Sequence, residues 1–125
     1  MYTTDIAAET QLNTAFRRVL FTTEHVQLVV MALKSGEDIG SEVHAHTDQI
    51  LTFIDGFALA EVDGETQNVG PGDIVIVPAG KRHNFTNVGD EPVRLYTIYS
   101  PPNHEPGTIH LTKADAVKLE SVEID

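Results

Sequence analysis

The sequence predicts an all-β fold of antiparallel strands, and two features of the chain carry this prediction. Its apolar segments are short and rich in Val, Leu, Ile and Phe, which is typical of strands. Turn-forming Gly, Pro and Asp residues separate these segments, and the dipeptide Asp63-Gly64 is of the kind that closes a tight hairpin. Short strands alternating with such turns favour a closed barrel or a two-sheet sandwich.

The predicted strands follow one another through most of the chain. A turn at 22–24 joins the first two into a hairpin. Asp55-Gly56, Asp63-Gly64 and the turn at 89–92 each predict a further hairpin. The segments with strand character are 16–21, 26–33, 49–54, 57–62, 74–77, 83–88 and 93–99.

The two ends of the chain do not follow this pattern. Residues 1–15 are polar and weakly patterned, so we expect an N-terminal arm that is loose or pairs as a strand only in an oligomer. Residues 16–100 form the predicted barrel, and residues 101–125 form a tail. Within the tail, Thr112 and Asp115 have the spacing of a capping box, which predicts a short C-terminal helix.

Length, charge and cysteine content limit the function classes. The chain has 125 residues, enough for one domain with a single core. Its formal net charge of -11 argues against nucleic acid or an anionic membrane as partner, because both require a basic surface. Without cysteine, neither a disulfide framework nor a thiolate metal site can form. We find no apolar run of membrane-spanning length and no signal peptide, so we expect a cytoplasmic protein.

The stretch GDIVIVPAGKRHNFTN at 72–87 resembles the second sequence motif of the cupin superfamily. It matches that motif at every signature position, and these positions are Gly72, Pro78, Gly80, His83 and Asn87. The resemblance implies a cupin-type antiparallel β-barrel, or jelly roll, with one divalent metal ion held inside by side chains of two motifs. It says less about activity, because one fold hosts many chemistries.

The stretch GEDIGSEVHAHTDQILTFIDG at 36–56 resembles the first cupin motif in its spacing but not in its ligands. When Gly36 and Gly56 are aligned on that motif's glycines, Glu42 and His44 occupy the positions where the family usually has two histidines. Gln49 occupies the position of the usual glutamate. The resemblance therefore implies that the metal ligands are Glu42, His44, Gln49 and His83.

Strand geometry supports a metal independently of this resemblance. Side chains of a strand alternate between its faces, so we expect Glu42, His44 and His46 to point the same way. Carboxylate and imidazole groups buried without partners cost several kcal/mol, and one divalent ion satisfies several of them. A second register, in which His46 replaces Glu42 as a ligand beside His44, stays open. Glu42 and His46 are also the candidates to move a proton in catalysis.

Two histidines and one carboxylate around open coordination positions are typical of non-haem iron(II) sites. Iron or manganese is therefore the favoured ion, with nickel or zinc as alternatives. Gln49 is a poorer ligand than imidazole, and a hydrogen bond to a bound water is its alternative role. The interpretation without a metal is that His44 and His83 are core histidines hydrogen-bonded to backbone carbonyls and that Glu42 is a solvated acid.

Three function classes follow from such a site. The first is a dioxygenase-like oxidoreductase acting on a small organic molecule, with open metal positions for substrate and dioxygen. The second is a metal-assisted isomerase or lyase of sugars or uronates, and the third is a module that binds a small ligand without turnover.

Small cupins resemble one another in pairing through sheet edges, so we expect a homodimer. Other basic residues are interpreted as surface or packing residues, with anion binding as the alternative for the arginines; they are Arg17, Arg18, Arg82, His25, His104 and His110.

Overall fold

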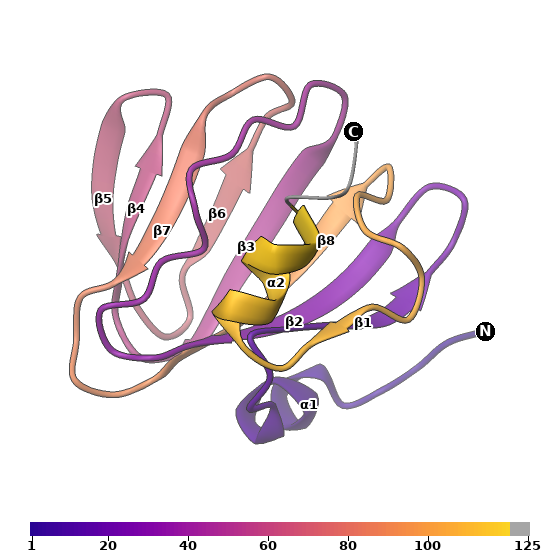
Figure 1. Cartoon of the computed structure of the whole chain (residues 1–125), viewed down its shortest axis with the longest axis horizontal. Coiled ribbons are helices and arrows are strands. Elements are labelled where there is room, and N and C mark those ends of the chain that lie inside the picture. The colour runs from indigo at the N-terminus through magenta and orange to yellow at the C-terminus, as the bar shows by residue number, and fades with distance from the viewer. Residues whose placement is uncertain (121–125) are drawn as a thin grey trace.

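The structure, a computed structural model, describes residues 1–120 and shows two antiparallel sheets that face each other (Figure 1). The elements in chain order are α1 (Ile6–Leu12), β1 (Arg17–Thr22), β2 (Gln27–Leu33), β3 (Asp48–Asp55), β4 (Ala58–Val62), β5 (Glu65–Val69), β6 (Ile74–Val77), β7 (His83–Asn87), β8 (Val93–Ser100), β9 (Ile109–His110) and α2 (Lys113–Glu120). The larger sheet has six strands in the order β6-β3-β8-β2-β1-β9, and the smaller has three in the order β5-β4-β7. The predicted all-β jelly roll with a short C-terminal helix is confirmed.

The core lies between the two sheets. Along β7 and β8, buried side chains alternate with partly exposed ones, as expected where one face of a strand is turned inward. Phe53 of β3 and Phe85 of β7 are both fully buried, and their ring centroids lie 5.9 Å apart. These rings join the larger sheet to the smaller one. Removal of either ring would cost about 3–5 kcal/mol of stability.

Two of the predicted hairpins form. β1 pairs with β2, and β4 pairs with β5 through Asp63-Gly64, where both residues have positive φ angles of 52° and 82° as a type I′ turn requires. The hairpin predicted at Asp55-Gly56 is wrong, because β3 pairs with β6 and β8 while β4 pairs with β5 and β7. Gly56 instead forms a corner between the sheets, with a φ of 81° and the carbonyl oxygen of Pro92 only 2.5 Å from where a Cβ atom would stand.

The hairpin predicted across 89–92 is also wrong, since β7 and β8 belong to different sheets. The side chain of Asn87 holds this second corner. Its amide group donates to the carbonyl oxygens of Leu33 at 3.0 Å and Glu91 at 2.9 Å, and its Oδ1 accepts from the backbone N–H of Gly89 at 2.9 Å. The motif asparagine therefore fixes the crossover between the sheets.

The two ends of the chain are more ordered than expected. The loose arm or strand predicted over the first residues is wrong, because Asp5 caps helix α1 by accepting from the N–H of Ala8 at 3.1 Å. Helix α2 begins at the predicted capping box, where Thr112 and Asp115 each accept from the other's backbone N–H. Strand β9 was not predicted, and residues 121–125 of the predicted tail lie outside the described residues. Among residues 1–120, no helix combines the length and apolar character needed to cross a membrane.

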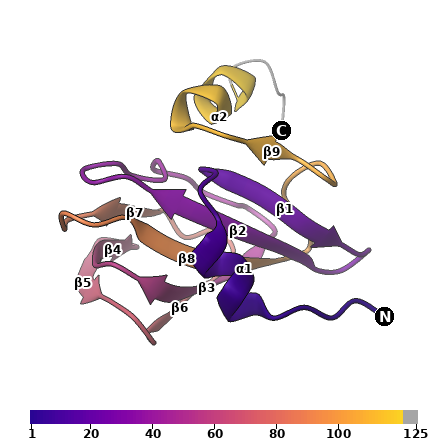
Figure 2. The same ribbon diagram turned by 90° about the horizontal axis from the view of Figure 1, so that it is seen from below.

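The sheets are bridged on one side and open on the other. On the bridged side, the segment 36–42 runs along β7, forming isolated antiparallel bridges from Asp38 to Thr86 and from Glu42 to His83. Helix α2 and β9 lie together on this side (Figure 2), and Lys113 of α2 pairs with Asp38. On the other side, β5 and β6 line a cavity of about 680 Å³ that contains none of the predicted metal ligands.

Candidate metal centre

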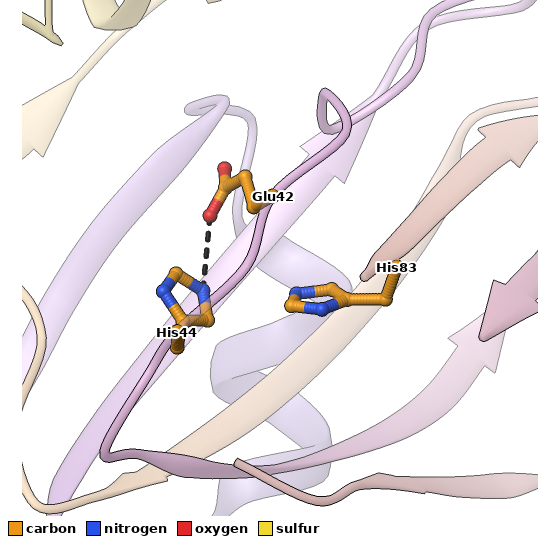
Figure 3. A group of neighbouring side chains, drawn as sticks. All are labelled: Glu42, His44 and His83. Atoms are coloured by element: carbon orange, nitrogen blue, oxygen red, sulfur yellow. Dashed lines mark ion pairs between the residues drawn. The ribbon is translucent and has the colours of Figure 1, made fainter. Parts of the chain in front are cut away.

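Three of the predicted ligands converge in the structure. Glu42, His44 and His83 each present one potential ligand atom, and these atoms all lie within 4.8 Å of one another. Glu42 and His44 come from the irregular segment before β3, and His83 is the first residue of β7 (Figure 3). The two sequence motifs therefore meet at this point.

Backbone hydrogen bonds explain why Glu42 and His83, 41 positions apart in the sequence, come together here. The N–H of Glu42 donates to the carbonyl of His83, and the N–H of His83 donates to the carbonyl of Glu42, both at 3.0 Å. The N–H of Gly80 donates to the carbonyl of His44 at 2.8 Å. Gly80 has a φ of 84°, a left-handed conformation that favours glycine at this turn.

The imidazole of His83 is held in an orientation suited to metal binding. His83 is 4% exposed, and its Nδ1 lies 2.9 Å from the carbonyl oxygen of Lys81. A carbonyl only accepts, so Nδ1 carries the proton and Nε2 keeps its lone pair. Burial lowers the pKa of His83 below its usual value. The ring is therefore neutral at neutral pH, which is the form that ligates metals.

Glu42 and His44 are close without being hydrogen-bonded. Oε2 of Glu42 lies 3.0 Å from Nε2 of His44, yet this buried nitrogen makes no hydrogen bond to the described residues. Two ligand atoms bonded to one ion at about 2.1 Å and at right angles stand about 3.0 Å apart. This close contact, an ion pair without hydrogen-bond geometry (Figure 3), fits a shared divalent ion. The side chains are 22% and 11% exposed, so solvent reaches this group from the side of Glu42.

Gln49 lines the same interior. It pairs directly with Tyr99 across β3 and β8, which puts both side chains on one face of the sheet, and the ring of Tyr99 lies 5.8 Å from that of His44. Gln49 is 2% exposed, and its Nε2 donates to Oγ1 of Thr97 at 3.1 Å. Its Oε1 is buried and has no hydrogen-bond partner among the described residues. That oxygen suits a metal or a bound water.

His46 does not join the group. Its side chain is exposed, so the expectation that it shares a face with Glu42 and His44 is wrong. The expectation assumed a regular strand, but the chain bends at 45–46 and β3 begins only at Asp48. The alternation of side chains holds only within extended backbone.

Two basic residues close to the triad, Arg17 and His110, were interpreted from the sequence as surface or packing residues, with anion binding as the alternative for Arg17. Arg17 is 1% exposed, its Nη2 lies 4.0 Å from Oε1 of Glu42, and its Nη1 lies 3.3 Å from Nδ1 of His110. The alternation of side chains along β1 could have indicated the burial of Arg17. Arg17 and the buried Val19 are two positions apart, so their side chains lie on the same face of the strand. No pattern in the sequence indicated a role for His110, since it is the pairing of β9 with β1 that brings it opposite Arg17.

His104 is the other basic residue near the site. Its ring lies 5.2 Å from that of Tyr99, edge to face. Burial, followed by the charges of Arg17, His44 and His110, lowers the pKa of His104 to about 3. The imidazole of His104 is therefore neutral in the folded protein at neutral pH.

Comparison with known proteins places the chain in a family. A cupin-domain family model matches residues 29–99, more than half of the chain. The uncharacterized protein YrkC of Bacillus subtilis is 41% identical over 125 residues, covering 95% of this chain and 67% of YrkC. The crystal structure of BH2720 from Bacillus halodurans is 40% identical, with a TM-score of 0.92 over 94% of this chain and 93% of that one. The polyketide synthase CurC of Streptomyces cyaneus is 30% identical over 68% of this chain and 56% of CurC. The chain therefore belongs to the cupin domain family.

Proposed function

We propose that the protein binds one divalent metal ion through Glu42, His44 and His83. The observation that carries this proposal is the pair of donors 3.0 Å apart, in which the buried Nε2 of His44 faces a carboxylate without a hydrogen bond. Gln49 is proposed as a fourth ligand or as the partner of a bound water, because its buried Oε1 has no hydrogen-bond partner among the described residues. Two imidazoles and a carboxylate favour iron or manganese.

We propose further that the protein is a dioxygenase-like oxidoreductase acting on a small organic molecule. An iron or manganese ion in such a site supplies Lewis-acid and redox chemistry at open coordination positions. The chain's own residues contribute a carboxylate at Glu42, which is reachable from solvent and is placed to accept or return a proton. His83 and the buried Phe85 and Tyr99 restrict water on the inner side of the site. The similarity to CurC, a polyketide synthase, supports a small organic substrate.

The test is metal analysis of protein purified without added metal, followed by oxygen uptake with iron- or manganese-loaded protein over a panel of small organic substrates. Oxygen consumed in proportion to product supports the proposal. Product formed without oxygen uptake assigns the protein to the metal-assisted isomerases or lyases instead. Metal without turnover across the panel favours a ligand-binding module. The cytoplasmic location expected from the sequence stays a prediction.

A further inference from the structure

The open side of the sandwich holds a cavity that the proposed metal centre does not use. On the side away from α2, β5 and β6 are edge strands of the two sheets (Figure 2). The cavity between them has a volume of about 680 Å³ and contains none of the proposed metal ligands. Pockets that bind small molecules typically measure roughly 300–1,000 Å³. The cavity is therefore large enough for a small organic ligand.

The inner faces of both sheets give this cavity an apolar floor. On β4, Ala60 and Val62 belong to or pack against the hydrophobic core, and both line the cavity. On β6, Val75 pairs directly with the fully buried Leu51 of β3, which puts its side chain on the inner face as well. Val69 of β5 completes the floor. Small aliphatic side chains of this kind favour the apolar body of a ligand.

A carboxylate stands on the same inner face. Glu65 of β5 pairs directly with Val62 of β4, and directly paired residues present their side chains on one face of a sheet. Glu65 therefore points toward the inside of the sandwich, where apolar side chains are usual, and it lines the cavity. It forms no ion pair with any other residue of the described range 1–120. Its charge is available to a ligand.

The charges around the cavity favour a cation over an anion. Three acids and one base line it, and these are Asp63, Glu65, Asp73 and Lys81. The base is already engaged, because Nζ of Lys81 lies 3.4 Å from Oδ2 of Asp63. The formal net charge of -11 for the whole chain adds to the negative potential. An anionic ligand would be repelled here, whereas a cationic one would be attracted.

We propose that this cavity binds a small apolar molecule that carries a protonated amine. The aliphatic floor packs against the apolar body, and the carboxylate of Glu65 faces the ammonium group. Val62 also pairs directly with His83 of β7, so the ligand contacts a residue that neighbours the candidate metal centre. The inference does not rest on the metal, because the residues that carry it are separate from the proposed ligands.

Naphthylmethylamine, a cation at neutral pH, is the probe for this site. Naphthylmethanol is its uncharged analogue, and naphthylacetate is an anionic one. Binding is measured from the fluorescence anisotropy of the naphthyl group, which is readily selected because the chain has no tryptophan. Each titration is made with protein as purified and again after a chelator has removed metal.

Two variants and one control test the residues. Glu65→Gln removes the charge while keeping the shape, and Val75→Phe fills part of the cavity. Glu61→Gln is the matched control. Glu61 is an exposed acid on β4, and it points to the outer face because the next residue, Val62, faces inward.

We expect the amine to bind and the alcohol to bind about 2- to 5-fold more weakly, which is the range of an exposed ion pair, with the anion weaker still. Glu65→Gln should lower the affinity for the amine to that for the alcohol, and added salt should have a similar effect. Val75→Phe should weaken binding of the amine by at least about 10-fold, because its ring occupies the space of the ligand. Glu61→Gln and removal of metal should leave the affinity unchanged.

Absence of binding by the wild type overturns the inference and leaves the open side to a second copy of the chain. Equal affinity for the three probes, or an unchanged affinity in Glu65→Gln, also overturns it. Binding that is lost with the metal would place the amine at the metal centre and has the same consequence. Glu65→Gln decides the outcome if Val75→Phe does not fold. A protein that holds no metal but binds the amine through Glu65 supports this inference while the metal proposal fails.

Discussion

At the scale of single residues, the predicted ligands differ in what they supply to an ion. His83 and His44 would supply imidazole nitrogens, while Glu42 would supply the one carboxylate within the described group. Loss of a residue that only hydrogen-bonds to a metal ligand typically lowers metal affinity roughly 10–100-fold. We expect His83→Ala and Glu42→Ala to lower it by more, because each removes a ligand. Metal content after dialysis, measured by elemental analysis, is the readout.

His46→Ala is the matched control for these variants, because His46 lies on the same segment but is exposed. It should retain full metal. Gln49→Ala should retain more metal than Glu42→Ala, since an amide adds no charge to the site. An empty His46→Ala protein beside a fully loaded Glu42→Ala protein would mean that the alternative register is the correct one.

A second prediction at this scale concerns acid stability. His104 titrates near pH 6.5 in the unfolded chain, whereas burial and then Arg17 lower its pKa to about 3 in the folded protein. Between these values the unfolded chain binds the extra proton, so stability falls as the pH decreases, by up to about 1.4 kcal/mol per pH unit. His104→Phe should remove that dependence from metal-free protein.

Denaturant unfolding of metal-free protein at a series of pH values between 6.5 and 4 measures this slope. His25→Phe is the control, because the side chain of His25 is 82% exposed. The variant at position 25 should keep the slope of the wild type. Identical slopes for wild type and His104→Phe would show that His104 is not a buried neutral group.

The residues of the site were predictable to different degrees. The resemblance to the two cupin motifs implied the meeting of Glu42, His44 and His83, and the structure brings their ligand atoms together. The burial of Arg17 and His104 close to these ligands was not predicted, for a physical reason. Their burial depends on the tail folding back, through β9 on β1 and through Gln27 on the loop at 103–104. Contacts this distant in sequence leave no local pattern.

At the scale of elements, the sequence predicted where strands begin and end better than how they pair. The apolar run 74–77 is observed as β6 with the same bounds. The turn at Asp55-Gly56 was expected to close a hairpin, but it carries the chain from one sheet to the other. A tight turn and a corner between sheets both call for glycine with positive φ. Only the packing against Pro92 distinguishes them.

Gly56→Ala tests this corner. A Cβ atom there would stand 2.5 Å from the carbonyl oxygen of Pro92 in addition to adopting an unfavourable φ of 81°. We expect a loss of at least about 2 kcal/mol in the free energy of unfolding, which thermal or denaturant unfolding measures.

Gly64→Ala is the matched control, because the φ of Gly64, 82°, is nearly equal to that of Gly56 but nothing lies within 4 Å of the added Cβ. Gly64→Ala should lower the free energy of unfolding by only about 1–2 kcal/mol, which is the effect of the unfavourable backbone conformation alone. Equal losses for the two variants would show that close approach at Pro92 adds nothing to the role of Gly56.

At the scale of the whole molecule, the two sides of the sandwich differ in how their edge strands are covered. On one side, β9 is in contact with α2, and Lys113 of that helix reaches Asp38 near β7. On the other side, β6 is an edge strand whose Ile74 and Ile76 are 59% and 61% exposed. An apolar edge strand is a template for pairing with another chain.

The expected homodimer stays a prediction, and β6 is the edge through which we expect it to form. Light scattering at micromolar concentration should give twice the mass of one chain. Ile76→Lys should give the monomer mass, because a charge in the middle of an apolar edge opposes pairing. Ile109→Lys is the control, since Ile109 is 56% exposed on the other edge strand, β9, and should leave the dimer intact. A wild-type protein with the mass of a single chain contradicts the homodimer. A dimer that survives Ile76→Lys but not Ile109→Lys would place the contact on the opposite edge, where it would have to accommodate α2.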